Sequence, residues 1–162
     1  MITKRPRRLR GVSYIGMLRY SLTICTACRR DIFASADAVA AVLAQLRQLA
    51  TLFEFAVVAY CFMPDHLHLL IAGQSEQSDL CEFVRRFKQV TAFAYRQAVG
   101  DDLWQPGYHE RVLRDDEATL TVARYILANP VRAGLATEVG EYPFVGSEVY
   151  DAKELLTAWE RI

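Results

Sequence analysis

Two apolar runs separated by a proline turn constrain the fold of this chain more than any other feature. Residues 53–62 are rich in Phe, Val and Tyr, and residues 66–72 form a second apolar run. Both runs have the length and composition of buried strands. The intervening Met63-Pro64-Asp65 is typical of a tight turn, because Pro presets φ and Asp bonds its own backbone. The sequence therefore predicts a well-buried β-hairpin.

Strands and helices alternate around this hairpin. Residues 14–25 are predicted to form a strand, and helices are expected to begin at Ser35, at Ser78 and at Asp115 or Asp116. Asn129-Pro130 is expected to stop the last of these. The expected elements are a strand at 14–25, a helix at 35–52, strands at 53–62 and 66–72, a helix at 78–99, a strand at 110–114, and helices at 115–127 and 152–161.

This order of elements predicts an α+β fold of the ferredoxin-like kind, a split β-α-β arrangement with extra C-terminal helices. Two helices should cover one face of an antiparallel sheet and leave the other face free. Along the chain we expect a basic N-terminal arm at residues 1–11, a catalytic domain at 12–147 and a helical tail at 148–162.

Charge is distributed unevenly, although the formal net charge is zero. No acidic residue precedes Asp31, whereas the C-terminal end is acidic. The basic arm is suited to neutralise DNA phosphates in a salt-sensitive way. An equally simple interpretation is a solvated terminus without a binding role.

Cysteine usage and hydropathy indicate the cellular compartment. The chain has four cysteines, no apolar run long enough to span a membrane, and no signal-peptide pattern. We therefore expect a cytoplasmic protein with reduced thiols and no membrane partner. Cys25 and Cys28 have half of a zinc-site spacing, but buried free thiols are the favoured interpretation.

His66 and His68 are the first candidates for chemistry. Positions two apart in a strand point to the same face, so the two imidazoles can share one divalent cation. A site left open for phosphate oxygens favours Mg²⁺ or Mn²⁺, with zinc as a second option. The alternative is a pair of histidines on a solvated sheet face.

The helix at residues 80–99 carries the second set of candidates. Arg85, Lys88, Ala92 and Tyr95 recur at spacings of three and four, so they share one helix face. A phenol can attack a phosphodiester if a cation such as Lys88 favours its ionised form. A half-buried tyrosine that packs on the sheet is the simpler interpretation of the same pattern.

With these residues in hand, the chain resembles the REP-associated tyrosine transposases, which belong to the single-tyrosine HUH transposases (His, hydrophobic residue, His). The resemblance covers about residues 10–147, nearly the whole chain. Four stretches carry it in order: Met63-Pro64-Asp65-His66-Leu67-His68; Leu103-Trp104-Gln105; Tyr108-His109-Glu110-Arg111-Val112-Leu113-Arg114-Asp115; and Tyr125-Ile126 with Asn129-Pro130-Val131-Arg132-Ala133-Gly134-Leu135.

The resemblance implies a metal-dependent enzyme that nicks single-stranded DNA hairpins and transfers strands through a 5′-phosphotyrosine. It assigns the nucleophile to a tyrosine on the helix after the HUH strand, which points to Tyr95, with Tyr108 as a second candidate. Relatives have a polar residue, often Gln, one turn after the tyrosine to complete the metal site. Val99 stands there in this sequence, so we expect Gln89 as the substitute ligand.

The DNA contacts and the competing functions complete the expectations. The sequence leaves undecided whether the protein is a monomer or a homodimer. Two alternatives stay open: a catalytically weakened or domesticated DNA-hairpin binding protein, and an unrelated small metal-dependent hydrolase. The residues expected to contact DNA are Arg5, Arg7, Arg8, Arg10, Arg132 and Trp104.

Overall fold

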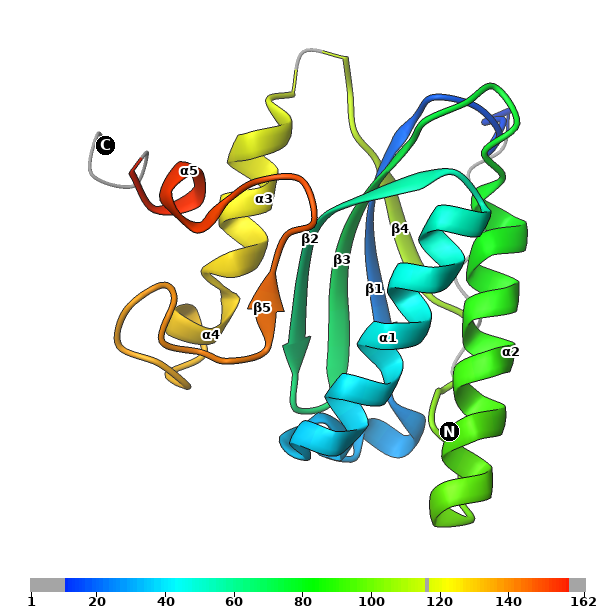
Figure 1. Ribbon diagram of the computed structural model, residues 1–162, viewed down its shortest axis with the longest axis vertical. Helices are drawn as coiled ribbons and strands as arrows, with labels where there is room; N and C mark the ends of the chain where they lie inside the picture. Colours follow the sequence, from blue (N-terminus) through cyan, green and yellow to red (C-terminus); the bar gives the residue numbers. More distant parts are fainter. Residues whose placement is uncertain (1–10, 116, 158–162) are drawn as a thin grey trace.

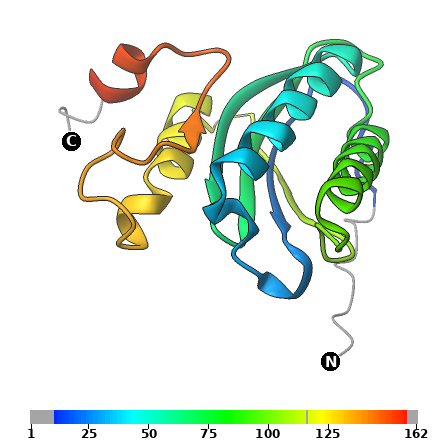
Figure 2. The same ribbon diagram turned by 60° about the horizontal axis from the view of Figure 1, so that its bottom comes forward.

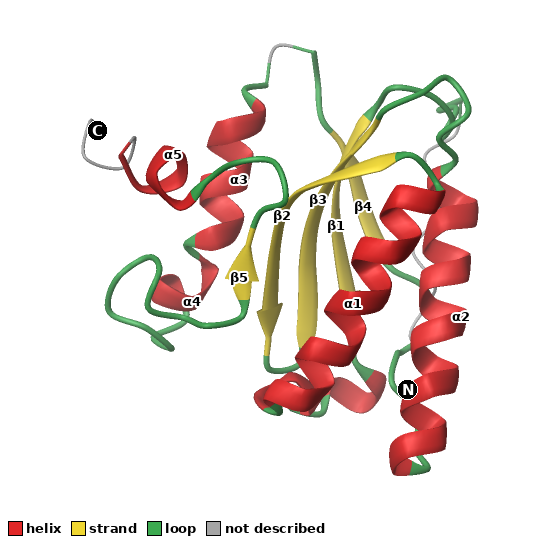
Figure 3. Cartoon of the chain, viewed as in Figure 1, coloured by secondary structure: helices red, strands yellow, loops and turns green. Residues whose placement is uncertain are grey.

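A computed structural model, describing residues 11–115 and 117–157, forms a five-stranded antiparallel sheet flanked by helices (Figure 1 and Figure 3). The strand order is β4-β1-β3-β2-β5. The strands are β1 (Arg19–Cys25), β2 (Phe55–Met63), β3 (His66–Gly73), β4 (His109–Val112) and β5 (Val145–Gly146). The α-helices are α1 (Ala36–Leu52), α2 (Leu80–Val99), α3 (Thr119–Leu127), α4 (Asn129–Arg132) and α5 (Ala152–Thr157), and short 3₁₀ turns occupy Ala27–Arg29 and Ile32–Ala34.

The predicted hairpin is confirmed and lies inside the sheet. Strands β2 and β3 pair from Met63 and His66 at the turn, with one irregularity between Val57 and Ala59. Strand β1 pairs with the other edge of β3, and β4 pairs with β1. This is the strand order of the predicted ferredoxin-like arrangement, so the α+β fold class is confirmed.

The main core lies between one face of the sheet and the helices α1 and α2 (Figure 2). Alternate residues of β1 and β3 enter this core because side chains two apart share a face of the sheet. The complete burial of Tyr20, Leu22 and Ile24 follows the alternation of apolar residues along β1, as expected of a strand with one face in the core. The fully buried members from these two strands are Tyr20, Leu22, Ile24, Leu67, Leu69 and Ile71.

The second face of the sheet carries a smaller core under α3. Leu70 of β3 and Cys61 of β2 pack there with Ala123 and Ile126 of the helix. Figure 2 shows α3 and α4 on the side of the sheet away from α1 and α2. The expectation that this face is free is therefore wrong beneath α3, because the apolar side of that helix covers part of it.

Several predicted boundaries differ from the structure. Strand β1 begins at Arg19 rather than residue 14, since Gly16 adopts a φ of +116° and bends the chain before it. Asp79 caps α2 instead of Ser78, and its carboxylate accepts from the Glu82 amide at 3.1 Å. The Ser78 hydroxyl instead donates to the Glu54 carbonyl and ties the preceding loop to the sheet.

The beginning of α3 is held by a residue that is distant in the sequence, Arg19 of β1. The helix starts at Thr119 without a side-chain cap, so the expected cap at Asp115 is wrong, and Asp116 lies outside the described residues. The Arg19 guanidinium donates to the carbonyls of Arg114 and Glu117, both at 2.7 Å, and to the Thr119 hydroxyl at 2.6 Å. We call these three bonds the Arg19 clamp.

The C-terminal part departs from expectation at the Asn129-Pro130 pair. Helix α3 ends before it, but the pair then opens α4 instead of leading into a loop. Proline is compatible with a first helical turn, where its missing amide hydrogen is not needed. The arm at 1–10 and residues 158–162 lie outside the described part. Across the described residues, the helices are too short or too polar to cross a membrane.

Candidate functional site

The histidine pair lies at the start of β3, on the sheet face that α3 partly covers. Leu67 and Leu69 enter the main core, so His66 and His68 point to the opposite side together with Leu70. Both histidines are only partly exposed. The strand thus presents two imidazoles side by side, as its sequence predicts.

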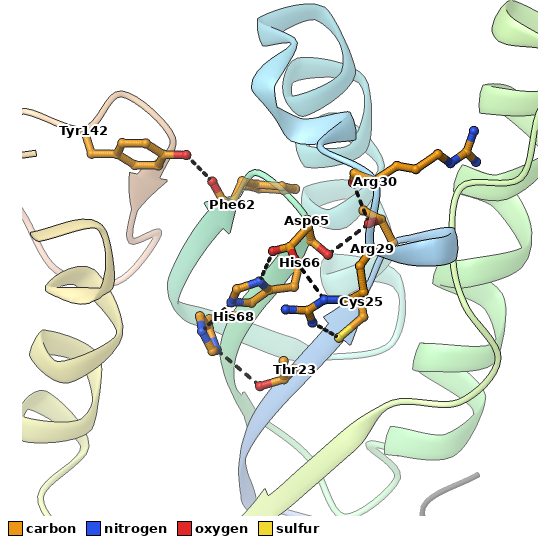
Figure 4. Close-up of polar contacts among 10 residues, drawn as sticks. Thr23, Cys25, Arg29, Arg30, Phe62, Asp65, His66, His68 and Tyr142 are labelled. Atoms are coloured by element: carbon orange, nitrogen blue, oxygen red, sulfur yellow. Dashed lines mark hydrogen bonds and ion pairs between the residues drawn. The ribbon is translucent and has the colours of Figure 1, made fainter. Parts of the chain in front are cut away.

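The geometry of the pair suits a shared cation. The two Nε2 atoms lie 3.0 Å apart, and the rings are nearly perpendicular, at 87° (Figure 4). Two nitrogen ligands about 2.1 Å from one cation, at right angles, are about 3 Å apart. The separation of Nε2 atoms in His66 and His68 therefore fits two ligands of one metal ion.

Neighbouring polar groups hold both rings by their other nitrogen. Nδ1 of His66 lies 2.6 Å from Oδ1 of Asp65, and Nδ1 of His68 lies 3.2 Å from the Thr23 hydroxyl. A carboxylate can only accept, so Nδ1 of His66 carries the proton and its Nε2 keeps a lone pair. Carboxylate–histidine pairs of this kind orient metal ligands in proteins.

The electrostatics keep His68 in its ligand form. Burial, followed by electrostatic interactions with His66, Arg132 and Arg29, lowers the pKa of His68 to about 4. Its imidazole is therefore neutral near pH 7, which is the form that binds metals. Within the described chain, no cluster of three His, Cys, Asp or Glu side chains has metal-binding geometry.

The three candidates on α2 do not join this site. Helix α2 packs on the main core, which lies on the other face of the sheet from the histidines. Tyr95 packs against that core and lines a cavity of about 400 Å³ between α1 and α2. The expectation that Tyr95, Lys88 and Gln89 surround the metal is wrong for a site within one chain, because the sheet separates them from it.

The observed contacts of Lys88 and Gln89 are structural. The Lys88 ammonium donates to the carbonyls of Gln105 and Gly107, at 2.8 and 2.6 Å, and so holds the loop before β4. The Gln89 amide oxygen accepts from Arg86 at 3.2 Å on the exposed side of α2.

The aromatic candidates also have packing roles. Trp104 is 9% exposed, donates from Nε1 to the Thr91 hydroxyl at 2.8 Å, and contacts the rings of Phe33 and Phe87. It is therefore not available to stack on a DNA base. Tyr108 packs, partly buried, against the same core.

The expectation of buried free thiols is confirmed for Cys25 and is wrong for Cys28. Cys25 is buried and accepts a hydrogen bond from Arg29 at 2.8 Å, while Cys28 is exposed. All four are free, and the Cys25–Cys28 pair has no further zinc ligands among the described residues.

Of the two predicted DNA contacts that the structure describes, Arg132 is the one whose charge reaches the histidines. Its guanidinium carbon sits 3.8 Å from the centre of the Tyr125 ring, and its charge acts on the pKa of His68. Tyr125 is 63% exposed, and it lies on α3 one turn after Val122, which packs against the second core. The structure thus brings a tyrosine, an arginine and the histidine pair to one side of the sheet.

Tyr125 was not among the residues predicted for this site. The signal that identifies it is the spacing to Asn129, a polar residue one helical turn after the tyrosine. This is the polar residue that is missing after Tyr95. The remaining predicted DNA contacts, Arg5, Arg7, Arg8 and Arg10, lie outside the described residues.

Comparisons with known proteins identify the family of this chain. The family model described as "Transposase IS200 like" matches residues 15–129. A Haemophilus influenzae protein provisionally named REP-associated tyrosine transposase is 27% identical over 124 residues, which cover 64% of this chain and 69% of that protein. The ISDra2 transposase TnpA of Deinococcus radiodurans is 30% identical over 109 residues, covering 61% of this chain and 75% of that protein. The chain spans about half the length of two further curated relatives.

A solved structure has the same fold. It is a REP-associated tyrosine transposase bound to a REP hairpin, with a TM-score of 0.72 and 22% identity, and the match covers 88% of this chain and 82% of that one. Since the family model accounts for well over half of the sequence, the chain belongs to the IS200-like transposase family.

Proposed function

We propose that this chain cuts single-stranded DNA and transfers the cut strand, with Tyr125 as the nucleophile beside a metal site at His66 and His68. One observation carries the proposal. The exposed Tyr125 and the histidine pair occupy the same side of the sheet, and Arg132 links them: it lies over the Tyr125 ring, and its charge contributes to the lowered pKa of His68. Tyr125 therefore replaces Tyr95 in the role that the resemblance implies.

The histidine Nε2 atoms would hold Mg²⁺ or Mn²⁺, and the Asn129 amide oxygen is the best candidate for a third protein ligand. When bound, the cation would supply Lewis-acid polarisation of a non-bridging phosphate oxygen. The donor set of two neutral imidazoles and an amide leaves room for phosphate and water oxygens. Asp65 and Thr23 contribute by holding the two rings in place.

The cutting step needs only the tyrosine as a covalent participant. The Tyr125 oxygen attacks the phosphorus, the bond from phosphorus to the 3′ oxygen breaks, and the tyrosine becomes joined to the 5′ phosphate. The phenolic proton is lost and the departing 3′ oxygen gains one, leaving a 3′ hydroxyl. The phosphodiester bond energy is kept, so a 3′ hydroxyl can attack the phosphotyrosine and rejoin DNA without a nucleotide cofactor.

Arg132 assists this step through its charge. A cation over the face of a phenol ring favours the negative charge that develops on the attacking oxygen. A guanidinium also suits phosphate recognition, because its donors match two phosphate oxygens at once. The same side chain can thus serve the nucleophile and the DNA backbone.

The proposed substrate is single-stranded DNA folded into hairpins. The solved relative bound to a REP hairpin supports this choice, and so does the basic sequence of the arm at residues 1–11. Helix α3 packs on the sheet of its own chain, so one copy carries both the histidines and the tyrosine. We therefore propose that a single copy is sufficient for cutting.

The two alternative functions, a binding-only DNA-hairpin protein and an unrelated metal-dependent hydrolase, are less well supported. The absence of a polar residue after Tyr95 favoured a weakened, binding-only protein, but Asn129 stands one turn after Tyr125. Membership of the transposase family counts against an unrelated hydrolase.

Covalent capture tests the proposal. The protein is incubated with Mn²⁺ and labelled single-stranded hairpins, and label that survives denaturation on the protein is measured. Tyr125→Phe and His66→Ala should abolish the label, while the matched control Tyr95→Phe should retain it. Loss of label in Tyr95→Phe but not in Tyr125→Phe would contradict the assignment. Tight binding of hairpins without label on the wild-type protein would support the binding-only alternative.

A further inference from the structure

We infer that Arg29 is a positioning residue for the histidine pair, which it reaches through Asp65. Nε of Arg29 lies 2.9 Å from Oδ2 of Asp65, and Oδ1 of the same carboxylate lies 2.6 Å from Nδ1 of His66 (Figure 4). Each oxygen of Asp65 thus has one partner. The inference rests on the proposed metal site for its functional meaning, although the contacts stand without it.

The contacts form one continuous series across the sheet face. They run from Arg29 to Asp65, on to His66, across 3.0 Å to His68, and end at the Thr23 hydroxyl. Arg29 lies at one end of this series and is 51% exposed, whereas the histidines are more buried. Arg29 therefore holds the solvent-exposed end of this series of contacts in place through its ion pair with Asp65.

The backbone at Arg29 is held in a conformation that side chains rarely adopt. Cys28 and Arg29 have φ values of 55° and 54°, in the left-handed region that favours glycine. Two such residues in succession persist only where surrounding contacts determine them, and they cluster at functional sites. This conformation brings the guanidinium onto Asp65.

The loop that carries Arg29 is docked onto the β2–β3 turn. The fully buried Thr26 donates from its amide to the Asp65 carbonyl at 3.0 Å, and its hydroxyl lies between the carbonyls of Arg30, at 2.7 Å, and Asp65, at 3.0 Å. On the far side, Arg30 pairs with Asp101 and donates to the Asp102 carbonyl at 2.6 Å. The loop and the turn are therefore one unit, and the left-handed pair is fixed within it.

The fork of the Arg29 guanidinium matters as well as its charge. While Nε meets Asp65, one terminal nitrogen donates to the Cys25 sulfur at 2.8 Å. Two contacts in different directions fix the plane of the guanidinium, and hence the direction from which it meets the carboxylate. A lysine can keep the ion pair but cannot make both contacts.

The experiment measures the ring of His66 directly, in metal-free protein. Long-range ¹H–¹⁵N correlation spectra report which imidazole nitrogen carries the proton. We expect a single Nδ1–H tautomer in the wild type, a mixture of tautomers in Arg29→Gln, and an intermediate spectrum in Arg29→Lys. The matched control is Arg30→Gln, which removes the neighbouring loop contact without touching Asp65. It should keep the wild-type spectrum.

Mn²⁺ affinity, measured by titration without DNA, links this effect to the metal site. Loss of an outer partner typically weakens metal binding 10- to 100-fold. We expect about that loss in Asp65→Asn, up to about tenfold in Arg29→Gln, and less than about twofold in Arg30→Gln.

The outcomes separate the two proposals. Wild-type tautomer and wild-type affinity in both Arg29 variants would overturn the positioning role and leave the proposed function intact. A wild-type protein that does not bind Mn²⁺ would overturn the metal site, while an Arg29-dependent tautomer would still support positioning. Equal changes of the His66 tautomer and of the Mn²⁺ affinity in Arg29→Gln and Arg30→Gln would mean that only the docking of the loop matters. This result would also overturn the positioning role of Arg29.

Discussion

The guanidinium carbon of Arg132 lies 3.8 Å from the centre of the Tyr125 ring. The contact forms because α3 ends at Leu127 and α4 begins at once, so the chain turns and brings Arg132 back over the exposed side of α3. The same guanidinium donates to the Asn129 side-chain oxygen at 2.5 Å. Tyrosine, asparagine and arginine are therefore one connected group.

Removing the charge of Arg132 should slow cutting more than it weakens folding. We expect Arg132→Gln to reduce the single-turnover rate of covalent capture about tenfold, which corresponds to about 1.4 kcal/mol of lost transition-state stabilisation. Arg124→Gln serves as the control, because Arg124 lies on α3, the helix that carries Tyr125, without the ring contact. A rate for Arg132→Gln equal to that of the control would contradict the assisting role.

Asn129 should contribute to metal binding through its amide oxygen. We expect Asn129→Ala to weaken Mn²⁺ binding about tenfold in a titration without DNA, because a neutral oxygen ligand is lost. Asn129→Asp supplies an oxygen at the same position and should bind at least as tightly as the wild type. Unchanged affinity in Asn129→Ala would remove this residue from the metal site.

The thiols should react according to their burial. Burial raises the pKa of Cys61 to about 12, whereas Cys28 is exposed. At pH 8 the reagent DTNB should modify Cys28 rapidly and Cys61 only after unfolding, since the thiolate is the reactive form. Rapid modification of both thiols in the native protein would contradict this description.

The raised pKa of the Cys61 thiol also makes the stability of the protein depend on pH. The Cys61 thiol ionises near pH 9 in the unfolded chain but only near about 12 in the folded one. Its contribution to the free energy of unfolding is therefore complete below pH 9 and is lost as the pH rises through that window. Denaturant melts at pH 8 and pH 10.5 should show lower stability at the higher pH, and Cys61→Ala should reduce the difference.

Gly73 is required by the close approach of two backbone segments. A Cβ at this position would collide with the backbone carbonyl oxygen of Gly16, which cannot move without shifting the chain. We expect Gly73→Ala to lower the free energy of unfolding by roughly 1–3 kcal/mol. A Cβ at Gly146 would instead meet the end of the Tyr60 side chain, so Gly146→Ala should cost less. The reverse order in urea melts would contradict this.

Local patterns predicted the centre of the fold. The apolar runs around Pro64 define the β2–β3 hairpin, and period-two alternation in β1 identifies its core face, because both signals depend only on neighbouring residues. The short strand β5 gave no such signal, since its two residues pair with β2 from a distant loop. The arrangement of α1 and α2 followed from the order of elements alone.

The sequence predicted the histidines of the site but not its tyrosine, because the side of the sheet on which a helix packs depends on the topology of the chain. The spacing of His66 and His68 fixes their shared face within one strand. The basic face of α2 was also identified correctly as a face, but periodicity cannot say on which side of a sheet a helix packs. Tyr95 was therefore assigned to a site that lies across the sheet. The four-residue spacing from Tyr125 to Asn129 was the available local signal.

The Arg19 clamp has a consequence for how the molecule moves. Strand β1 supplies Arg19, which holds the beginning of the helix that bears Tyr125, and it also supplies Thr23, which contacts His68. The helix that carries Tyr125 and the histidine pair are thus both held by the same strand, β1. Thermal motion of β1 therefore displaces the tyrosine helix and the histidines together. Their positions relative to each other are maintained while their absolute positions fluctuate.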